Sequence, residues 1–315
     1  MCHIKGDPSM RRILITGASG LLGRPVFQTC ASVADWQVTG TAFRREGHGL
    51  VRVDLSAVET IPAFLDAVRP EAIIHSAAER RPDVSEKDPA GTQRLNVDAT
   101  AAIAVWAKRN GAYLVYLSSD YVFDGTQAPY TPDSPTCPIN TYGHSKLAGE
   151  HAIRDSGAIA AMLRVPILYG AVEYLAESSV TVLAQNMLKA LGTGIKLPMD
   201  HWATRYPTLT DDVAVVLRQM LEYHFTKGPL TGIYHWSGNE PMTKYDMALV
   251  FAQAIGFDPA QLSPDTTPPG SAAPRPKDCH LDSSVLESLG MGRRTPFAVA
   301  VPRILKGFLG ASPIH

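Results

Sequence analysis

RRILITGASGLLGR, residues 11–24, is the most informative segment for the fold, because a β-branched apolar run leads directly into three glycines separated by two residues each. The run is typical of a buried strand, and a helical pattern begins after the last glycine. Gly17 permits a tight turn, Gly20 lets a pyrophosphate approach the backbone, and Gly23 lets the helix pack closely. The helix N-terminus adds free N–H groups and partial positive charge. This order predicts a dinucleotide site.

Short apolar runs alternate with longer helical patterns through the first half of the chain. The strand candidates are RILITG (12–17), WQVTGTAF (36–43), EAIIHSAA (71–78), YLVYLSS (113–119) and AAMLRVPILYG (160–170). Such alternation predicts repeated β-α-β units. We therefore expect an α/β fold of the Rossmann type, a doubly wound parallel sheet with helices on both faces.

The rhythm changes after Gly170, where strand and helix alternate less clearly and proline becomes frequent. This change predicts a smaller substrate-type domain interleaved with the first, since TGIYHWSG (231–238) has the character of one more strand. We expect a dinucleotide domain at 11–168 plus about 205–237, a smaller domain at 169–204 and 238–309, and a flexible N-terminus at 1–10.

Two further stretches of the second half have a clear character. Six prolines between Asp258 and Lys277 argue against any regular element there. The tail PFAVAVPRILKGFLG (296–310) is apolar enough to pack as a helix.

Composition favours a small-molecule enzyme or binding protein. The chain has 315 residues, 19% of them charged, and a formal net charge of -1. It therefore lacks the basic excess that would hold nucleic acid or an anionic membrane, and we expect neither as a partner.

The cysteines and the N-terminal sequence bear on the compartment. The cysteines (Cys2, Cys30, Cys137 and Cys279) are far apart, which favours neither zinc nor a disulfide framework, so no metal site is expected. MCHIKGDPSM (1–10) is too polar for a signal peptide, and no apolar run approaches a membrane span. We expect a cytoplasmic protein with reduced thiols.

The end of the second strand candidate indicates which dinucleotide is bound. Arg44 and Arg45 stand where an NAD site would carry an acid for the ribose 2′-hydroxyl. NADP(H) is therefore favoured, the alternative being a solvated basic turn. Asp54 is placed to accept a hydrogen bond from the adenine amino group, although an ordinary turn aspartate is equally consistent.

A serine, a tyrosine and a lysine follow in positions that suit carbonyl chemistry. Ser118 and Ser119 end an apolar strand, where ligands of such sheets bind. Tyr142 and Lys146 lie four residues apart at the start of a helical run, so that the lysine is expected to lower the pKa of the phenol. Ser119 would polarise a carbonyl, Tyr142 would exchange the proton, and Lys146 would also hold the nicotinamide ribose.

The same spacing occurs a second time, at Tyr223 and Lys227. That copy follows a separate helical run and ends in Lys-Gly-Pro, so we interpret it as a helix terminus.

The glycine loop, SSDYVFDG (118–125) and Tyr142-x-x-x-Lys146 together resemble the extended short-chain dehydrogenase/reductase family. PT-x-x-x-D (207–212) and RP followed by LD (275–282) are similar to its dTDP-4-dehydrorhamnose reductase branch. That branch implies a sugar-nucleotide substrate. Where its members read D-Q-x-G-x-P-T, this chain reads DHWATRYPT, which adds bulk near the expected substrate lobe.

A closer resemblance is to the regulatory β-subunits of methionine adenosyltransferase. It is carried by AAERRPDV, LNVDA, SSDYVFDGT, LRVPILYG, SVTVL, MDHW, HWSGNE, MTKY and RTPF. It implies a partner, the catalytic methionine adenosyltransferase subunit, in a hetero-oligomer. It also implies NADP contacts at Ser19, Gly20, Leu21, Leu22, Phe43, Arg44, Arg45, Asp54, Leu55, Ser76, Arg80, Tyr142 and Leu168.

Five other residues have both a functional and a structural interpretation. Arg80 follows a strand end and is favoured as a contact to cofactor phosphate or a substrate anion, whereas Arg81 is favoured as a surface ion-pair partner. His75 is expected to be a hydrogen-bonded core histidine. His201 and Trp202 either line a pocket or pack internally.

Three hypotheses follow from the sequence. The first is a regulatory β-like subunit of methionine adenosyltransferase that binds NADP(H). The second is an active NADPH-dependent reductase of a 4-keto sugar nucleotide, and the third is a redox-sensing NADP(H) binder with another partner.

Overall fold

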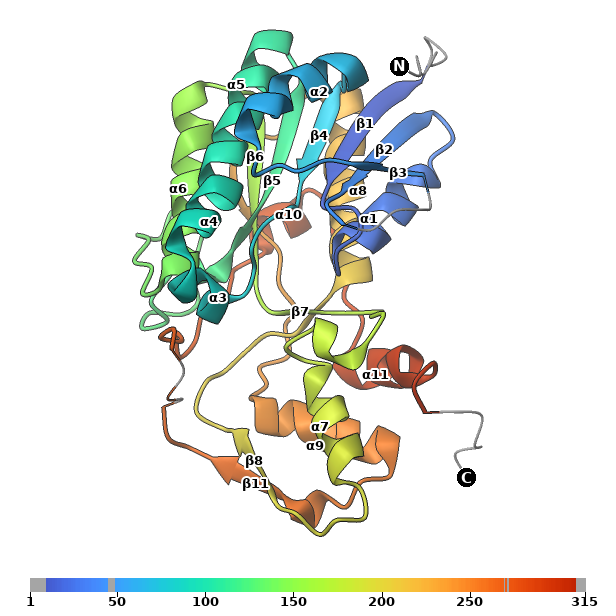
Figure 1. Ribbon diagram of the computed structural model, residues 1–315, viewed down its shortest axis with the longest axis vertical. Helices are drawn as coiled ribbons and strands as arrows, with labels where there is room; N and C mark the ends of the chain where they lie inside the picture. Colours follow the sequence, from blue (N-terminus) through green and yellow to red (C-terminus); the bar gives the residue numbers. More distant parts are fainter. Residues whose placement is uncertain (1–9, 45–48, 269, 271, 310–315) are drawn as a thin grey trace.

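Seven parallel strands form one sheet, which confirms the expected doubly wound α/β fold (Figure 1). The computed structural model describes residues 10–44, 49–268, 270 and 272–309, so nearly all of the expected flexible N-terminus lies outside the described residues. The strand order is β10-β6-β5-β4-β1-β2-β3. These strands are β1 (Arg11–Thr16), β2 (Trp36–Ala42), β3 (Leu50–Arg52), β4 (Ala72–His75), β5 (Tyr113–Ser119), β6 (Ala160–Val165) and β10 (Gly232–His235).

Helices cover both faces of the sheet because successive strand residues point to opposite sides. Ile13 and Ile15 pack toward α1 and α8, whereas Leu14 packs toward α2, α5 and α6. Figure 1 shows these two groups of helices on opposite sides of the sheet. The helices are α1 (Gly23–Ala31), α2 (Ile61–Val68), α3 (Pro82–Lys87), α4 (Pro89–Gln93), α5 (Ala99–Asn110), α6 (Thr141–Ser156), α7 (Val182–Ala190), α8 (Thr210–Lys227), α9 (Lys244–Ile255), α10 (Ser284–Ser288) and α11 (Phe297–Leu305).

A smaller lobe lies beyond the carboxyl ends of the strands (Figure 1). Its apolar core joins α7, α9 and α11, and β8 (Leu197–Asp200) pairs with β11 (Leu262–Asp265) beside them. A second short pair, β7 (Leu168–Tyr169) with β9 (Thr208–Leu209), lies where the chain leaves the sheet. The exact domain division given above remains a prediction.

The two expectations for the C-terminal stretches had different outcomes. The apolar tail is helical, as predicted, and buries Phe297, Val301 and Leu305 of α11. The expectation of no regular element among the six prolines is wrong, because β11 contains Pro264. A strand of a two-stranded pair has a free edge, where a residue without an N–H is tolerated. Among the described residues, no helix combines the length and apolarity needed to cross a membrane.

A buried ion pair between Arg164 and Glu150 joins β6 to α6. Arg164 donates from Nε to Oε1 of Glu150 at 2.9 Å and from Nη2 to Oε2 at 2.7 Å. Both side chains are 4% exposed. Ser118 also donates to Glu150. Since a lone charge at this depth would be poorly solvated, each partner depends on the other.

We predict that Arg164→Met lowers the free energy of unfolding by about 3–5 kcal/mol, because it leaves the Glu150 carboxylate buried without its partner. The double variant Glu150→Gln/Arg164→Met should lose less than the single variant, since it removes both charges. Urea unfolding measures both.

The matched control is Arg218→Gln, which breaks the half-exposed i,i+4 pair of Arg218 with Glu222. It should cost about 1 kcal/mol or less. Equal losses in Arg164→Met and Arg218→Gln would contradict the assigned importance of the buried pair.

Candidate functional site

The glycine loop adopts the tight path that its sequence predicts. Gly17 has a φ of +68°, and a Cβ there would lie 2.9 Å from the Ala77 backbone. A Cβ on Gly23 would lie 2.0 Å from the Gly17 carbonyl oxygen, whereas one on Gly20 would meet only that oxygen, at 3.3 Å. Gly17 and Gly23 are therefore required by the backbone itself, and the face of the loop at Gly20 is left open.

A cleft of about 470 Å³ lies at the carboxyl ends of the central strands. The structure brings most of the predicted site residues to its wall. These are Gly17, Ser19, Gly20, Leu21, Leu22, Gly23, Phe43, Asp54, Leu55, Ser76, Arg80, Ser119, Tyr142, Lys146 and Leu168. Thr204, Arg205 and Tyr206, from the segment between β8 and β9, also line it. The cleft therefore combines the glycine loop, the Ser/Tyr/Lys group and this later segment of the chain.

The residues predicted to contact the adenosine 2′-phosphate directly follow the end of β2, at the rim of the cleft. Phe43 lines the cleft, and the exposed Arg44 places its guanidinium carbon 5.2 Å from the Phe43 ring centroid. Arg45 lies outside the described residues. Asp54 accepts from the backbone N–H and hydroxyl of Ser56, at 2.9 and 2.6 Å, so it is a turn aspartate that also faces the cleft.

The start of α6 is fixed tightly, and this fixes Tyr142. Asn140 caps the helix by accepting from Gly143 N–H at 2.8 Å, and Thr141 donates its hydroxyl to Glu86 at 2.7 Å. A Cβ on Gly143 would lie 2.2 Å from the Tyr121 carbonyl oxygen, so only glycine allows this approach. The helix therefore presents Tyr142 beside Ser119 at the end of β5.

Burial governs the protonation of this group. It raises the pKa of Tyr142 above its ordinary value, and the hydrogen bond with Ser119 lowers that pKa only in part. Burial also lowers the pKa of Lys146 to about 7, although Glu150 opposes this shift. The expected lowering of the Tyr142 pKa is therefore wrong in direction. The Lys146 ammonium lies over the ring of Tyr116, 4.0 Å from its centroid, and Lys146 and Tyr116 are both buried.

Asp120 is a site residue that the sequence interpretation did not single out. It lines the cleft and accepts from the Ser119 hydroxyl at 3.0 Å. Burial raises its pKa to about 7, against the effects of Ser119 and Arg205. Its place directly after a strand end was the available signal, but the extent of its burial is a property of the folded chain.

A π-helical turn at Arg94–Asp98 also went unforeseen. It places Asn96 so that its side chain accepts from Glu79 N–H at 2.8 Å and donates to the Ser145 hydroxyl at 2.9 Å. These two hydrogen bonds join the segment before Arg80 to α6. A 3.6-residue periodicity gives no sign of the extra residue in such a turn.

Arg81 and His75 behave as expected, whereas the expected anion contact of Arg80 stays a prediction. Arg80 lines the cleft, whereas Arg81 is largely exposed and pairs with Glu79 at 2.7 Å. His75 is a buried core histidine between the hydroxyls of Thr16 and Thr100, at 2.7 and 3.0 Å. Burial lowers the His75 pKa to about 3, which keeps the imidazole neutral.

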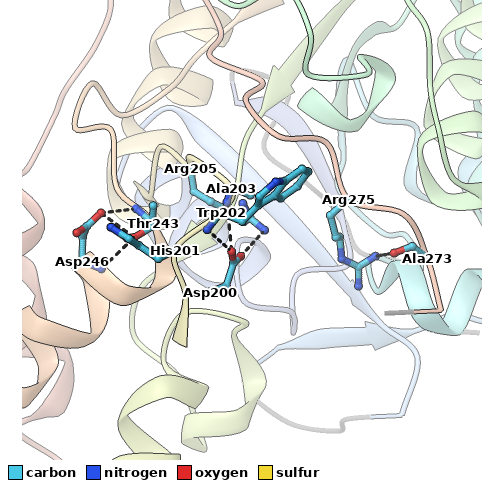
Figure 2. A network of polar contacts seen from close by, with 9 residues as sticks. All are labelled: Asp200, His201, Trp202, Ala203, Arg205, Thr243, Asp246, Ala273 and Arg275. Atoms are coloured by element: carbon cyan, nitrogen blue, oxygen red, sulfur yellow. Dashed lines mark hydrogen bonds and ion pairs between the residues drawn. The ribbon is translucent and has the colours of Figure 1, made fainter. Parts of the chain in front are cut away.

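The segment DHWATRYPT, residues 200–208, is bulkier than its counterpart in the reductases, and it folds around Asp200. Figure 2 shows this carboxylate accepting from the backbone N–H groups of Trp202 and Ala203, at 2.9 and 3.2 Å, and from Arg205 at 3.3 Å. His201 contacts the Thr243 hydroxyl at 2.9 Å. Arg205 therefore faces the cleft, while His201 and Trp202 stay outside its wall.

The second Tyr-x-x-x-Lys copy is a helix terminus, as interpreted from the sequence. Lys227 is the last residue of α8, and its ammonium lies 5.2 Å from the Tyr223 ring centroid. Neither residue lines the cleft. Within the described ranges, no group of three or more His, Cys, Asp or Glu side chains could hold a metal ion.

The sequence matches one family along nearly its whole length. Residues 10–309 match the family described as RmlD substrate binding domain. Methionine adenosyltransferase 2 subunit beta of Rattus norvegicus is 45% identical over 299 residues, covering 95% of this chain and 88% of that protein. The resemblance inferred from the motifs is thereby confirmed.

Solved structures show the same architecture. A hypothetical dTDP-4-dehydrorhamnose reductase from Sulfolobus tokodaii is 27% identical with a TM-score of 0.75, covering 88% of this chain and 94% of that one. The dTDP-4-dehydrorhamnose reductase of Bacillus anthracis, solved in complex with NADP, is 23% identical with a TM-score of 0.79, covering 96% and 100%. The latter similarity concerns the fold alone.

We predict that Asp120→Asn is more stable than the wild-type protein at pH 8 and that this advantage shrinks as the pH falls toward 4. The ordinary pKa of 3.8 is raised to about 7 on folding, so the folded protein retains a proton that the unfolded chain releases. The resulting penalty is absent below pH 4 and grows as the pH rises to about 7.

Urea unfolding of both proteins between pH 4 and 8 measures the difference. The exposed Asp133→Asn variant changes the net charge equally and serves as the control. A stability difference for Asp120→Asn that has the opposite slope with pH would refute the assignment.

Proposed function

This chain belongs to the RmlD substrate binding domain family, among the relatives named methionine adenosyltransferase 2 subunit beta, and we propose that it is an NADP(H)-binding regulatory subunit of methionine adenosyltransferase. In this role it associates with the catalytic subunit in a hetero-oligomer and modulates S-adenosylmethionine synthesis. The observation that carries the proposal is the 45% identity over 95% of the chain, which runs through both lobes.

Segments outside the cleft support regulation more than catalysis. HWSGNE (235–240) and MTKY (242–245) carry the resemblance beyond the cofactor half, and both are fully described. Neither contributes a residue to the wall of the cleft. MTKY instead begins α9, where Thr243 and Asp246 form a capping box. His235, Trp236 and Ser237 are buried, so packing accounts for their match, whereas Asn239 of the same stretch is exposed and open to a partner.

The residues of the loop and rim fit NADP(H). Gly17 and Gly23 form a cradle that a Cβ would fill, and within the described residues no side chain caps the N-terminus of α1, so its N–H groups suit a pyrophosphate. Phe43 and Asp54 suit the adenosine half. Arg44 suits the 2′-phosphate, and Tyr142 with Lys146 suits the nicotinamide ribose.

The partnership is tested by mixing the purified protein with a methionine adenosyltransferase catalytic subunit. We expect co-elution in size-exclusion chromatography and altered kinetics of S-adenosylmethionine formation. The B. anthracis reductase, which shares the fold, is the matched control and should do neither. Separate elution together with unchanged kinetics would contradict the proposal.

We predict that Arg44→Ala weakens NADPH binding about 10- to 100-fold and leaves NADH binding nearly unchanged, since only the former offers a 2′-phosphate to the guanidinium. Isothermal titration of both nucleotides measures this. Arg109→Ala, an exposed substitution in the last turn of α5, controls for the change in charge. Equal losses for NADPH and NADH would refute the 2′-phosphate assignment.

A second candidate function is favoured by one observation, the convergence of Ser119, Tyr142 and Lys146 on the cleft. NADPH, when bound, supplies a hydride. In this role Ser119 would donate to a substrate carbonyl oxygen, and Tyr142 would deliver a proton there. This arrangement suits reduction of a 4-keto sugar nucleotide.

We expect any NADPH oxidation with dTDP-4-keto sugars to be lost in Tyr142→Phe. The second tyrosine of the same spacing supplies the control, because Tyr223→Phe should leave the rate unchanged. Absence of turnover by the wild-type protein across such substrates would count against a reductase.

A further inference from the structure

A buried ion pair links α1 to the segment that follows β7. Arg24 donates from Nη1 to Oε1 and from Nη2 to Oε2 of Glu177, both at 2.8 Å. The Arg24 side chain is 20% exposed and that of Glu177 is 4% exposed. Paired N–H donors of this kind are strong and directional, and loss of one partner leaves a buried charge uncompensated.

The same guanidinium also holds the backbone on both sides of the pair. Its Nη1 donates to the carbonyl oxygen of Ser19 at 2.9 Å, and its Nη2 to that of Ala171 at 3.1 Å. Ser19 belongs to the glycine loop and lines the cleft. One side chain therefore ties the glycine loop to the first residues of the smaller lobe.

Glu177 is connected in turn to a second part of the cleft wall, the segment that follows β4. Its backbone carbonyl accepts from Arg80, which lines the cleft, and its Oε2 accepts from Glu173 N–H at 2.9 Å. Two residues further along, Ser179 also lines the cleft. The segment 171–179 is thus held between the glycine loop and Arg80.

The charges of the pair matter for an anion in the loop. A pyrophosphate at the N-terminus of α1 would approach the Glu177 carboxylate, and its attraction to the loop would be weakened by that charge. Arg24 compensates this carboxylate and also pairs, at 3.6 Å, with the more exposed carboxylate of Glu173, so that the loop keeps its positive potential. The pair therefore has an electrostatic role as well as a mechanical one.

We propose that Arg24 and Glu177 are positioning residues of the cofactor site, whose ion pair clamps segment 171–179 against the glycine loop and couples the order of this segment to cofactor binding. The inference rests on the NADP(H) binding of the proposed function and is independent of the methionine adenosyltransferase partnership. Because the segment leads into α7, bound cofactor also stiffens the start of the smaller lobe.

Hydrogen exchange of the full-length protein with and without NADPH tests the coupling. In the wild-type protein NADPH should slow exchange both in the loop, residues 17–24, and in segment 171–179. In Glu177→Gln the protection at 17–24 should remain, the protection at 171–179 should be lost, and the Kd for NADPH should rise about tenfold.

A double-mutant cycle tests the charge compensation. Arg24→Gln should lose more NADPH affinity than Glu177→Gln, because it leaves the Glu177 carboxylate without its counter-ion beside the glycine loop. The double variant Arg24→Gln/Glu177→Gln should recover part of that loss. The half-exposed pair of Arg218 with Glu222 provides the controls, since Arg218→Gln and Glu222→Gln should leave the Kd for NADPH unchanged.

Several results would overturn the assignment. Wild-type protein that binds NADPH without protection at 171–179 would exclude the coupling, whatever the variants do. A Glu177→Gln protein with an unchanged Kd and only a lower unfolding temperature would reduce the pair to a structural role. No NADPH binding by the wild-type protein would remove the cofactor assignment and this inference together.

Discussion

The glycine loop leaves no room for a side chain where α1 begins, and much of the structure depends on this contact. A Cβ on Gly23 would lie 2.0 Å from the Gly17 carbonyl oxygen. The close approach fixes the direction of α1, so that its N-terminus opens onto the cleft. It also places Arg24, the next residue, between the loop and Glu177. The anion site and its connection to the smaller lobe thus follow from one backbone constraint.

Two ion pairs of unequal burial connect helices that flank the sheet, α1 and α3, to segments that come later in the chain. Arg24 with Glu177 is almost fully enclosed, whereas Arg275 pairs with Asp83 of α3 at 2.5 Å, with side chains 15% and 46% exposed. Water competes with the second pair more than with the first, so the second contributes less. The cleft is therefore held more firmly beside the glycine loop than beside α3.

Local signals in the sequence sufficed for the parallel sheet and for much of the cleft. Strand ends of a parallel sheet meet at one edge, so Ser119 after β5 and Tyr142 at the start of α6 could be expected together. The same reasoning set Tyr223 and Lys227 apart. Asp120 was not singled out, and the pKa of Tyr142 was expected to move in the wrong direction, because both depend on burial by distant segments.

Periodicity, turn residues and spacing are local properties, so the amino-acid sequence alone predicts the alternation of strands and helices, the glycine loop and the residue types at the strand ends. Tertiary structure alone decided which of these groups are withdrawn from water, and hence how Tyr142, Lys146 and Asp120 titrate. It alone also joined Arg24 to Glu177, 153 positions apart. Burial and long-range pairing depend on how the smaller lobe closes over the sheet, and no local pattern in the sequence encodes that closure.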